Sequence, residues 1–156
     1  MKGNAEIISI LNELLTNELT AINQYFIHAK MLANWGYKRL AKKVRDESID
    51  EMKHADEIIE RILFLEGVPN LQRLNKLRVG ETPKEQFESD LAVEYASIAS
   101  LNGWIARARE LGDNGTEHML KHILDAEEEH TDWLETQLEL MRQLGEVPYL
   151  AQQLHD

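Results

Sequence analysis

The chain has 156 residues, enough for one domain with a sizeable core, and its 43% hydrophobic and 29% charged residues are typical of a soluble globular protein. A net charge of −11 argues against nonspecific binding to nucleic acid or to an anionic membrane surface, because both require an excess of lysine and arginine. The absence of cysteine excludes disulfides, thiolate nucleophiles and thiolate-held metals. Any bound metal must therefore have histidine and carboxylate ligands, which suit iron, manganese or zinc.

The sequence also lacks the features of an exported or membrane protein. No apolar run approaches the roughly 18 residues that would indicate a membrane span. The first residues lack the basic segment, apolar core and cleavage site of a secretion signal. We therefore expect a cytoplasmic protein that does not bind membranes.

Apolar residues recur at spacings of three and four along most of the chain, which predicts an all-α fold. Trp35 and Gly36 mark the end of the first helix, and residues 67–69 follow the second. Thr82 and Pro83 provide an N-cap and a first helical residue for the third helix, and Thr116 is a candidate N-cap for the fourth. The expected helices cover residues 4–35, 38–66, 83–111 and 116–144, followed by a short fifth helix over 148–154.

The lengths of the connections predict how these helices pack. The first and second helices, and likewise the third and fourth, are joined by short turns, so each pair is expected to form an antiparallel hairpin. Residues 67–82 are long enough to cross the length of the bundle between the two hairpins. The sequence thus predicts a single domain over residues 1–156: a four-helix bundle with one long crossover and a short C-terminal helix.

The chain contains an internal repeat of acidic residues. Glu18 and Glu51 are 33 residues apart, as are Glu94 and Glu127, and the second pair follows the first by 76 residues. Each hairpin therefore has one glutamate on its first helix and a second glutamate, at the same register, on its second helix.

The second glutamate of each pair begins a Glu-x-x-His sequence, formed by Glu51 with His54 and by Glu127 with His130. Residues three apart share a face of a helix, so each carboxylate lies beside an imidazole. A single Glu-x-x-His sequence is weak evidence of a metal site, because such residues are commonly solvated. Here, however, the glutamates and histidines fall on the apolar faces of their helices, for example between Ile123 and Leu134.

Four carboxylates directed into an apolar core would be prohibitively unfavourable unless cations neutralise them. A glutamate from each of two helices, combined with Glu-x-x-His from each of the other two, is the pattern of di-iron and di-manganese proteins. The sequence therefore predicts a metal pair, and buried salt bridges or surface glutamates are the less favoured alternative. Tyr25 shares the face of Glu18 and is either a hydrogen-bond or electron donor near the metals or an ordinary core tyrosine. The predicted metal ligands are Glu18, Glu51, His54, Glu94, Glu127 and His130.

Three segments resemble bacterioferritin, a haem-containing member of the ferritin-like superfamily: NELTAINQY at 17–25, DESIDEMKHAD at 46–56 and DAEEEHTDWL at 125–134. The resemblance extends over essentially the whole chain. It implies a ferritin-like fold and a hollow shell of 24 subunits that oxidises Fe(II) with oxygen or peroxide, stores ferric mineral and detoxifies iron. It also implies a b-type haem between the subunits of two-fold dimers, which assists iron release, and a small ferredoxin as electron donor.

The resemblance assigns roles to individual residues. Glu51 and Glu127 would bridge the two irons of a ferroxidase site, and Glu18 and Glu94 would be terminal ligands, with one histidine for each metal. Met52 lies about 100° around the helix from Glu51, on a second apolar face with Ile49. In a two-fold dimer a residue can meet its own copy, so two Met52 sulfurs could ligate one haem iron, as in the family. Without that context, packing is the commoner role of such a methionine.

Other acidic and histidine residues are assigned less firmly. Asp46 and Asp50 could face the cavity and bind incoming iron, although family members can have histidine in place of Asp46. His118 and His122 are four residues apart and could bind a surface metal, but an exposed pair is the simpler interpretation. His28 and His155 have no predicted role.

Three other functions remain as alternatives. A rubrerythrin-like peroxidase uses a similar bundle, but the absence of cysteine removes its usual rubredoxin part. A manganese-catalase-like enzyme is chemically possible with similar ligands. The chain could also be a non-catalytic shell subunit that stores iron or haem.

Overall fold

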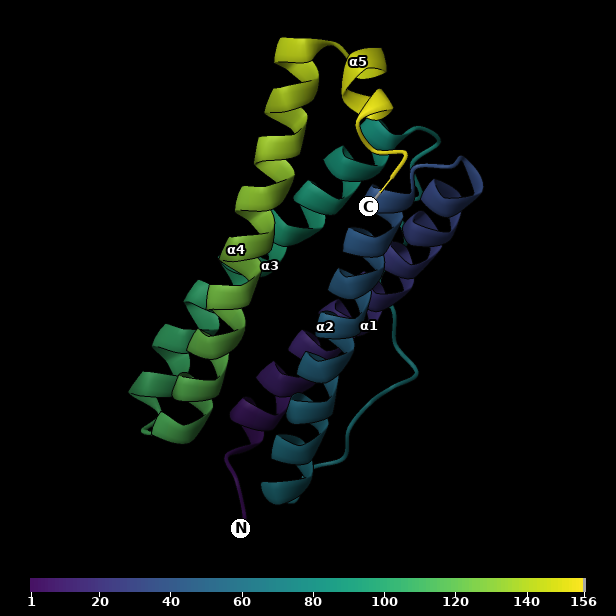
Figure 1. Ribbon diagram of the computed structural model, residues 1–156. Coiled ribbons are helices and arrows are strands. Elements are labelled where there is room, and N and C mark those ends of the chain that lie inside the picture. The colour runs from purple at the N-terminus through teal and green to yellow at the C-terminus, as the bar shows by residue number, and fades with distance from the viewer. Residues whose placement is uncertain (156) are drawn as a thin grey trace.

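The computed structural model describes residues 1–155, which form five helices and no strand. The helices are α1 (Ala5–Asn34), α2 (Lys38–Phe64), α3 (Pro83–Glu110), α4 (Asn114–Leu144) and α5 (Glu146–Ala151). Figure 1 shows α1 beside α2 in one hairpin and α3 beside α4 in the other, with α5 folded back near the start of α2. The predicted all-α fold class, with one long crossover and a short fifth helix, is confirmed.

Local side-chain chemistry sets most helix ends. The Asn4 carboxamide accepts hydrogen bonds from the backbone N–H groups of Glu6 and Ile7, so Asn4 is the N-cap of α1 rather than its first residue. At the start of α3, Thr82 Oγ1 accepts from the N–H of Glu85 (3.1 Å), as the sequence predicted. Gly36, between α1 and α2, has a φ of 92°, a conformation that glycine adopts without strain.

The starts of α4 and α5 also differ from the predicted ones. α4 begins at Asn114, and its N-cap is Asp113, whose carboxylate accepts from the N–H of Thr116 (3.0 Å). Thr116 is therefore inside the first turn and not the cap, because Asp is a stronger N-cap than Thr. α5 covers Glu146–Ala151 rather than 148–154, since Pro148 fits within a first helical turn, where a backbone N–H has no helical partner.

The second helix ends at Phe64, two residues before the predicted end. The N–H of Gly67 bonds to the Ile62 carbonyl (2.9 Å) and the N–H of Glu66 to the Leu63 carbonyl (3.0 Å), which is the hydrogen-bond pattern of a Schellman motif. The left-handed residue of this motif is Glu66 (φ 63°) and not the glycine that follows it. Gly67 has another role, because a Cβ atom there would lie 2.7 Å from the Ile8 side chain.

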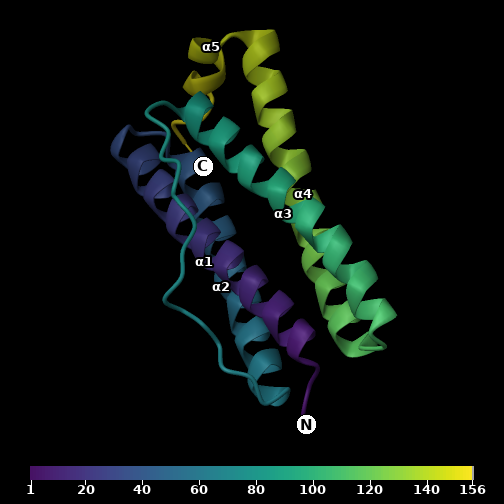
Figure 2. The same cartoon turned by 180° about the vertical axis from the view of Figure 1, so that it is seen from behind.

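The crossover between α2 and α3 runs along α1, as Figure 2 shows from behind. Polar side chains on successive turns of α1 fasten it: Asn12 bonds to the backbone of residues 68 and 70, and Thr20 Oγ1 accepts from the N–H of Asn75. Further along, Gln24 accepts from the N–H of Arg78. These bonds satisfy backbone groups of a segment that forms no helix or strand of its own.

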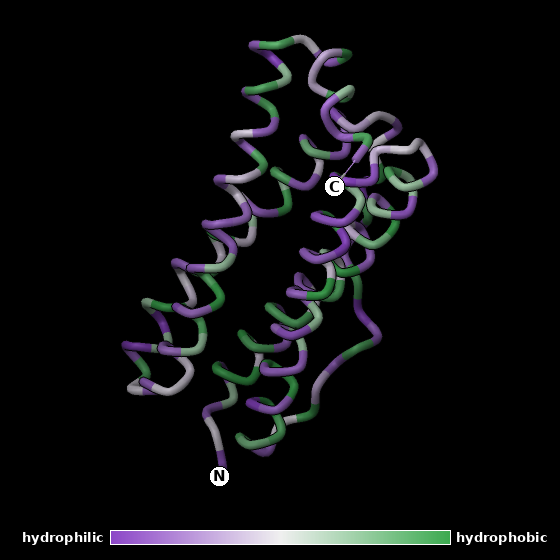
Figure 3. Tube along the Cα trace, in the orientation of Figure 1, coloured by the Kyte–Doolittle hydropathy of each residue, from purple (hydrophilic) through white to green (hydrophobic). Residues whose placement is uncertain are grey.

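The interior consists of two apolar clusters separated by a polar layer. One cluster includes Leu11, Ile58 and Ile123, and the other includes Leu32, Phe87 and Leu134. On each long helix the predicted metal ligands lie between the residues of these two clusters. Apolar and polar residues alternate along each helix in Figure 3, as expected for amphipathic helices. The polar layer is therefore enclosed by hydrocarbon at both ends.

Candidate metal centre

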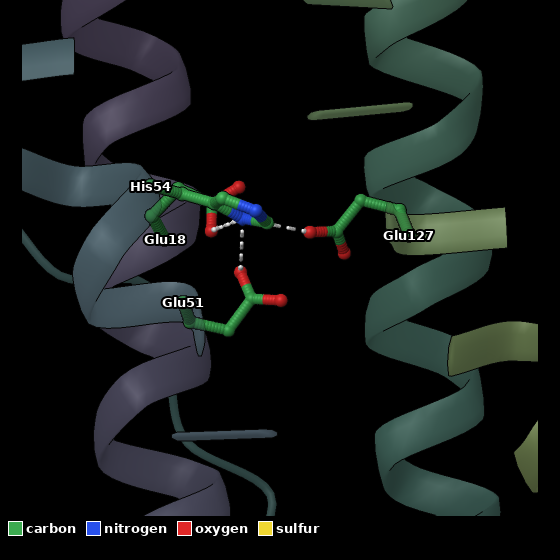
Figure 4. A group of neighbouring side chains, drawn as sticks. All are labelled: Glu18, Glu51, His54 and Glu127. Carbon is green, nitrogen blue, oxygen red and sulfur yellow. Dashed lines mark ion pairs between the residues drawn. The ribbon is translucent and has the colours of Figure 1, made fainter. Parts of the chain in front are cut away.

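One half of the polar layer is built around His54 (Figure 4). The carboxylates of Glu18 (α1), Glu51 (α2) and Glu127 (α4) converge on its imidazole, with Nδ1 3.5, 3.7 and 3.5 Å from their nearest oxygens. Ligand atoms of these four residues all lie within 4.8 Å of one another. The two hairpins thus contribute to one cluster of O and N donors, the chemistry that iron, manganese and zinc accept.

The other half is built around His130. Its Nδ1 lies 2.9 Å from Glu94 Oε1 and 3.6 Å from Glu47 Oε2. The Tyr25 hydroxyl donates a hydrogen bond to the same Glu94 oxygen, and the Tyr25 ring packs edge-on against His130. Glu94 also contacts Glu127, which therefore touches both halves of the cluster.

The four glutamates are buried and incompletely satisfied. Their exposed fractions are 1% for Glu18, 2% for Glu51, 0% for Glu94 and 2% for Glu127. Within residues 1–155, one oxygen of each of these carboxylates has no hydrogen-bond partner. Unpaired buried charges are expensive in the folded state, so this arrangement indicates that cations complete the site.

Burial and crowding also alter the proton affinities of these groups. Burial raises the pKa of Glu18, and burial together with the neighbouring charge of Glu127 raises the pKa of Glu94 well above its ordinary value. Burial, followed by the charge of Glu18, raises the pKa of Glu127. In the absence of metal, protons therefore take the place of cations at these carboxylates.

The two histidines respond in the opposite sense to burial. Burial lowers the pKa of His54, but its contacts with Glu127 and Glu18 outweigh that effect and raise the pKa to about 10. For His130, burial is likewise outweighed by its hydrogen bond to Glu94, and the pKa rises. Metal binding must therefore displace protons from the imidazoles as well as from the carboxylates.

The structure brings together all six residues that the sequence selected and adds four that it did not, which are Glu47 beside His130 and the network of Gln24, His28 and Asp90. The Asp90 carboxylate accepts from Gln24 Nε2 (2.8 Å) and lies 2.9 Å from Nδ1 of His28, whose Nε2 accepts from the N–H of Gly80 (3.0 Å). This network ties α1, the crossover and α3 together close to Glu94. The sequence does contain one signal for this network. Gln24 and His28 are polar residues four positions apart, so they lie on one face of α1, and that face also carries the apolar core residues beside Tyr25.

The remaining candidate residues lie outside the cluster. Met52 is 55% exposed on the outer face of α2, together with Ile49. Asp46 and Asp50 are exposed on the same helix, and Asp50 lines a cleft that reaches His54. Both His118 and His122 are exposed on α4, and His122 lines the same cleft.

Comparison with known proteins places the fold and the site in one class. The profile of the family described as Ferritin-like domain matches residues 8–144. In the part of the chain that the structure describes, no helix combines the length and apolarity that a membrane span requires. The class that the fold and the site define is therefore the ferritin-like proteins.

The similarity extends to particular relatives. The chain is 54% identical over 152 residues to the bacterioferritin of Mycobacterium leprae, and the alignment covers 97% of this chain and 96% of that protein. It is 48% identical over 149 residues to the bacterioferritin of Brucella melitensis, covering 96% and 92% of the two chains. The solved structure of the Mycobacterium tuberculosis bacterioferritin BfrA superposes with a TM-score of 0.98 at 53% identity, covering 99% and 98% of the two chains.

This chain belongs to the bacterioferritin family. Iron storage is the general function that this family membership supports for the protein. The resemblance found in the sequence is confirmed.

Proposed function

We propose that this protein is a ferroxidase that oxidises pairs of Fe(II) ions within each subunit and stores the ferric product in a hollow shell of 24 subunits. The observation that carries the proposal is the cluster of four buried glutamates and two histidines, contributed by both hairpins, in which each carboxylate has an oxygen without a partner. Two divalent cations would neutralise these carboxylates. The same positions would then hold a redox-active substrate among buried side chains.

The geometry supports a role for each ligand. Glu18 and His54 would bind one iron, and Glu94 and His130 the other, because each pair belongs to one half of the cluster. Glu127 contacts both halves, which favours a bridging position. Glu51 would be the second bridge, in keeping with the symmetry of the repeat.

The chemistry balances with either oxidant. Two Fe(II) ions each give one electron, and hydrogen peroxide with two protons becomes two water molecules as its O–O bond breaks. With dioxygen, the same two electrons and two protons give hydrogen peroxide. Tyr25 is placed to assist, because its hydroxyl donates to Glu94 and can supply a proton or an electron beside the second iron.

A haem would fit the outer face of α2. The Met52 side chain is exposed next to the exposed Ile49, on a face that is apolar and not needed by the core. A two-fold dimer through this face would bring two Met52 side chains together, and their sulfurs would hold the iron of one b-type haem. A bound haem would supply one-electron transfer for the reduction and release of stored iron, with a small ferredoxin as the proposed donor.

Stopped-flow mixing of anaerobic Fe(II) with oxygen or peroxide tests the ferroxidase proposal. The wild-type protein should show a fast phase that saturates at about two irons per subunit. Glu18→Ala combined with Glu94→Ala should abolish this phase while light scattering still shows an assembled shell. Glu128→Ala, which changes the exposed neighbour of Glu127, is the matched control and should retain the phase.

The same experiment separates the alternatives. A storage-only subunit would show no fast phase in the wild type, and a manganese-catalase-like enzyme would break down peroxide with manganese and leave Fe(II) oxidation slow. A double variant that oxidises iron at the normal rate would contradict the site assignment.

The haem assignment has its own test. Met52→Leu should lose the haem absorption of the purified protein, whereas Met119→Leu, a substitution on α4, should keep it. A Met52→Leu protein with the wild-type haem spectrum would contradict ligation by Met52.

A further inference from the structure

Two clefts reach the metal centre from different sides of the bundle. The α1–α3 cleft, of about 290 Å³, has the buried Glu18 and Glu127 at its base and the exposed Lys76, Arg78 and Ala96 at its rim. The α2–α4 cleft, of about 240 Å³, has the buried Glu51, His54 and His130 at its base and the exposed Asp50, Glu57 and Glu129 at its rim. The same cluster can therefore exchange molecules with solvent through two openings.

The two rims carry opposite charge. Apart from Glu18, Glu51 and Glu127 of the metal centre, the residues that line the α1–α3 cleft include no carboxylate, whereas Lys76 and Arg78 are both cations. The other lining residues are neutral, and several are small alanines and serines of α3.

The rim of the α2–α4 cleft is acidic. Lys43 and Lys53 line it, but they pair with Glu47 (2.9 Å) and Asp50 (3.9 Å) respectively. Glu57 and Glu129 have no basic partner within 4 Å among the described residues, so their charges remain uncompensated. At the base of this cleft, Glu51 Oε2 and His54 Nδ1 are buried ligand atoms without a hydrogen-bond partner.

The cationic rim is built into the fold. The crossover segment that carries it is fixed to α1, because Asn75 donates from its backbone N–H to Thr20 Oγ1 (2.9 Å) and from Nδ2 to Asn17 Oδ1 (2.9 Å). The backbone N–H of Arg78 is bonded to Gln24 (3.1 Å). Lys76 lies between these anchors, so its positive charge is held near the opening.

We propose that the two clefts separate the two substrates: Fe(II) reaches the site through the acidic α2–α4 cleft, and the oxygen-derived oxidant enters through the α1–α3 cleft. A rim of one sign concentrates ions of the opposite sign and can change their arrival rate by about 10- to 1,000-fold. A cationic rim repels Fe(II) but admits an uncharged oxidant such as dioxygen or hydrogen peroxide. Separate entry would let the oxidant reach irons that are already bound. This inference rests on the proposed ferroxidase function.

Charge reversal tests the route of the cation, with Co(II) as a redox-inert probe whose binding is followed by its visible absorption. Glu57→Lys combined with Glu129→Lys should slow Co(II) arrival at least about 10-fold and weaken its dependence on salt. Lys76→Gln combined with Arg78→Gln, which removes the positive charges without making this rim acidic, should change it less than about twofold. The inference is overturned if the second pair accelerates Co(II) binding several-fold while the first pair leaves it unchanged.

Steric closure tests the route of the oxidant. Ala96→Phe places a large side chain at the rim of the α1–α3 cleft, and Ala99→Phe, at an exposed residue of α3 outside that lining, is the matched control. Ala96→Phe should lower the rate of oxidation of preloaded Fe(II) by peroxide about 10-fold or more, with unchanged Co(II) stoichiometry and arrival rate. Oxidation at the rate of the Ala99→Phe control would overturn this half of the inference.

Failure of this inference can be distinguished from failure of the proposed function. If the wild-type protein binds no Co(II) pair and shows no fast Fe(II) oxidation, the ferroxidase proposal itself is wrong. The wild type could instead bind the Co(II) pair and oxidise Fe(II) rapidly while variants at the two clefts change the Co(II) arrival rate and the oxidation rate to the same extent. In that case the proposed metal centre is supported and only the separation of routes is refuted.

Discussion

The two halves of the metal centre are related by the 76-residue repeat, but their surroundings are different. Around His130 lie Tyr25, Glu47 and Asp90. The residues 76 positions away from these three are Leu101, Ile123 and Leu14, which belong to the apolar cluster next to the His54 half. The repeat thus preserves the proposed ligands and not the groups around them.

This difference changes what each half must do to accept a metal ion. In the His54 half, Nδ1 has no hydrogen-bond partner among the described residues, and neither do the facing oxygens of Glu18 and Glu51. In the His130 half, Nδ1 is hydrogen-bonded to Glu94, which is also held by Tyr25. A cation must displace protons in both halves, but only in the His130 half must it also break the hydrogen bond between Nδ1 and Glu94. The two metals should therefore bind unequally and have unequal redox properties.

The largest expected effect comes from removing one histidine at a time. In a Co(II) titration, wild-type protein should bind about two ions per subunit, the first at the His54 half. His54→Ala should remove the tighter phase and His130→Ala the weaker one, each leaving about one ion per subunit. His122→Ala, at an exposed histidine, is the control and should retain both phases. Loss of both ions in either variant would show that the halves are not separable.

A second effect should follow from removing the hydroxyl that distinguishes the two halves. Tyr25→Phe eliminates the hydrogen bond to Glu94 and leaves the ring in place. Loss of an outer hydrogen bond to a metal ligand commonly lowers affinity or activity 10- to 100-fold, so we expect a decrease of about that size in the fast oxidation rate. Tyr149→Phe is the matched control, because Tyr149 is a buried residue of α5 whose hydroxyl donates a hydrogen bond to Gln137, away from the metal centre. Equal rates for the two variants would show that Tyr25 only packs in the core.

A third effect concerns the metal-free protein and its pH dependence. The pKa of Glu94 in the folded protein is well above 4.5, and that of His54 is raised from 6.5 to about 10. The folded state therefore retains protons that the unfolded chain has released, so stability must fall as pH rises above about 4.5, and again between about 6.5 and 10. The melting temperature of chelator-treated protein should accordingly decrease between about pH 5 and pH 9.

The two halves should differ in this pH dependence as well. Because burial and the charge of Glu127 both raise the pKa of Glu94, whereas the contacts of Glu18 with His54 oppose the effect of burial, Glu94→Gln should flatten the profile more than Glu18→Gln does. Glu128→Gln, at an exposed position, should leave the profile unchanged. A melting temperature that rises with pH in the metal-free wild type would contradict the raised pKa values.

The sequence predicted that the proposed metal ligands would meet, because both the spacing of the repeat and the helical period can be read from the sequence alone. Glu18 and Glu94 lie on the apolar faces of their helices at the same register. When the two hairpins pack through these faces, both glutamates must be buried in the core. The same reasoning predicted the crossover, since only residues 67–82 are long enough to span the bundle.

Features that depend on contacts between distant segments could not be predicted in this way. The burial of Asp90 is explained only by its partners Gln24 and His28, which are 66 and 62 residues away in the sequence. The early end of α2 depends on Glu66 adopting a left-handed conformation, which its residue type does not favour. Gly67 appeared to be the helix terminator, whereas its small size is required by the contact with Ile8.

The smallest expected effect distinguishes support of the fold from support of the site. Asp90→Asn keeps an oxygen that can accept from Gln24 and His28, but it replaces charge-assisted hydrogen bonds by neutral ones. We expect the metal-free protein to lose about 1 kcal/mol of stability in urea unfolding, with fast iron oxidation within about twofold of the wild type. Asp90→Leu, which has the side chain found at the equivalent position Leu14, should cost more, because it leaves two buried donors without an acceptor. If Asp90→Asn slows oxidation as much as Tyr25→Phe does, the network positions Glu94 for catalysis, and the polar surroundings of the His130 half act as one unit.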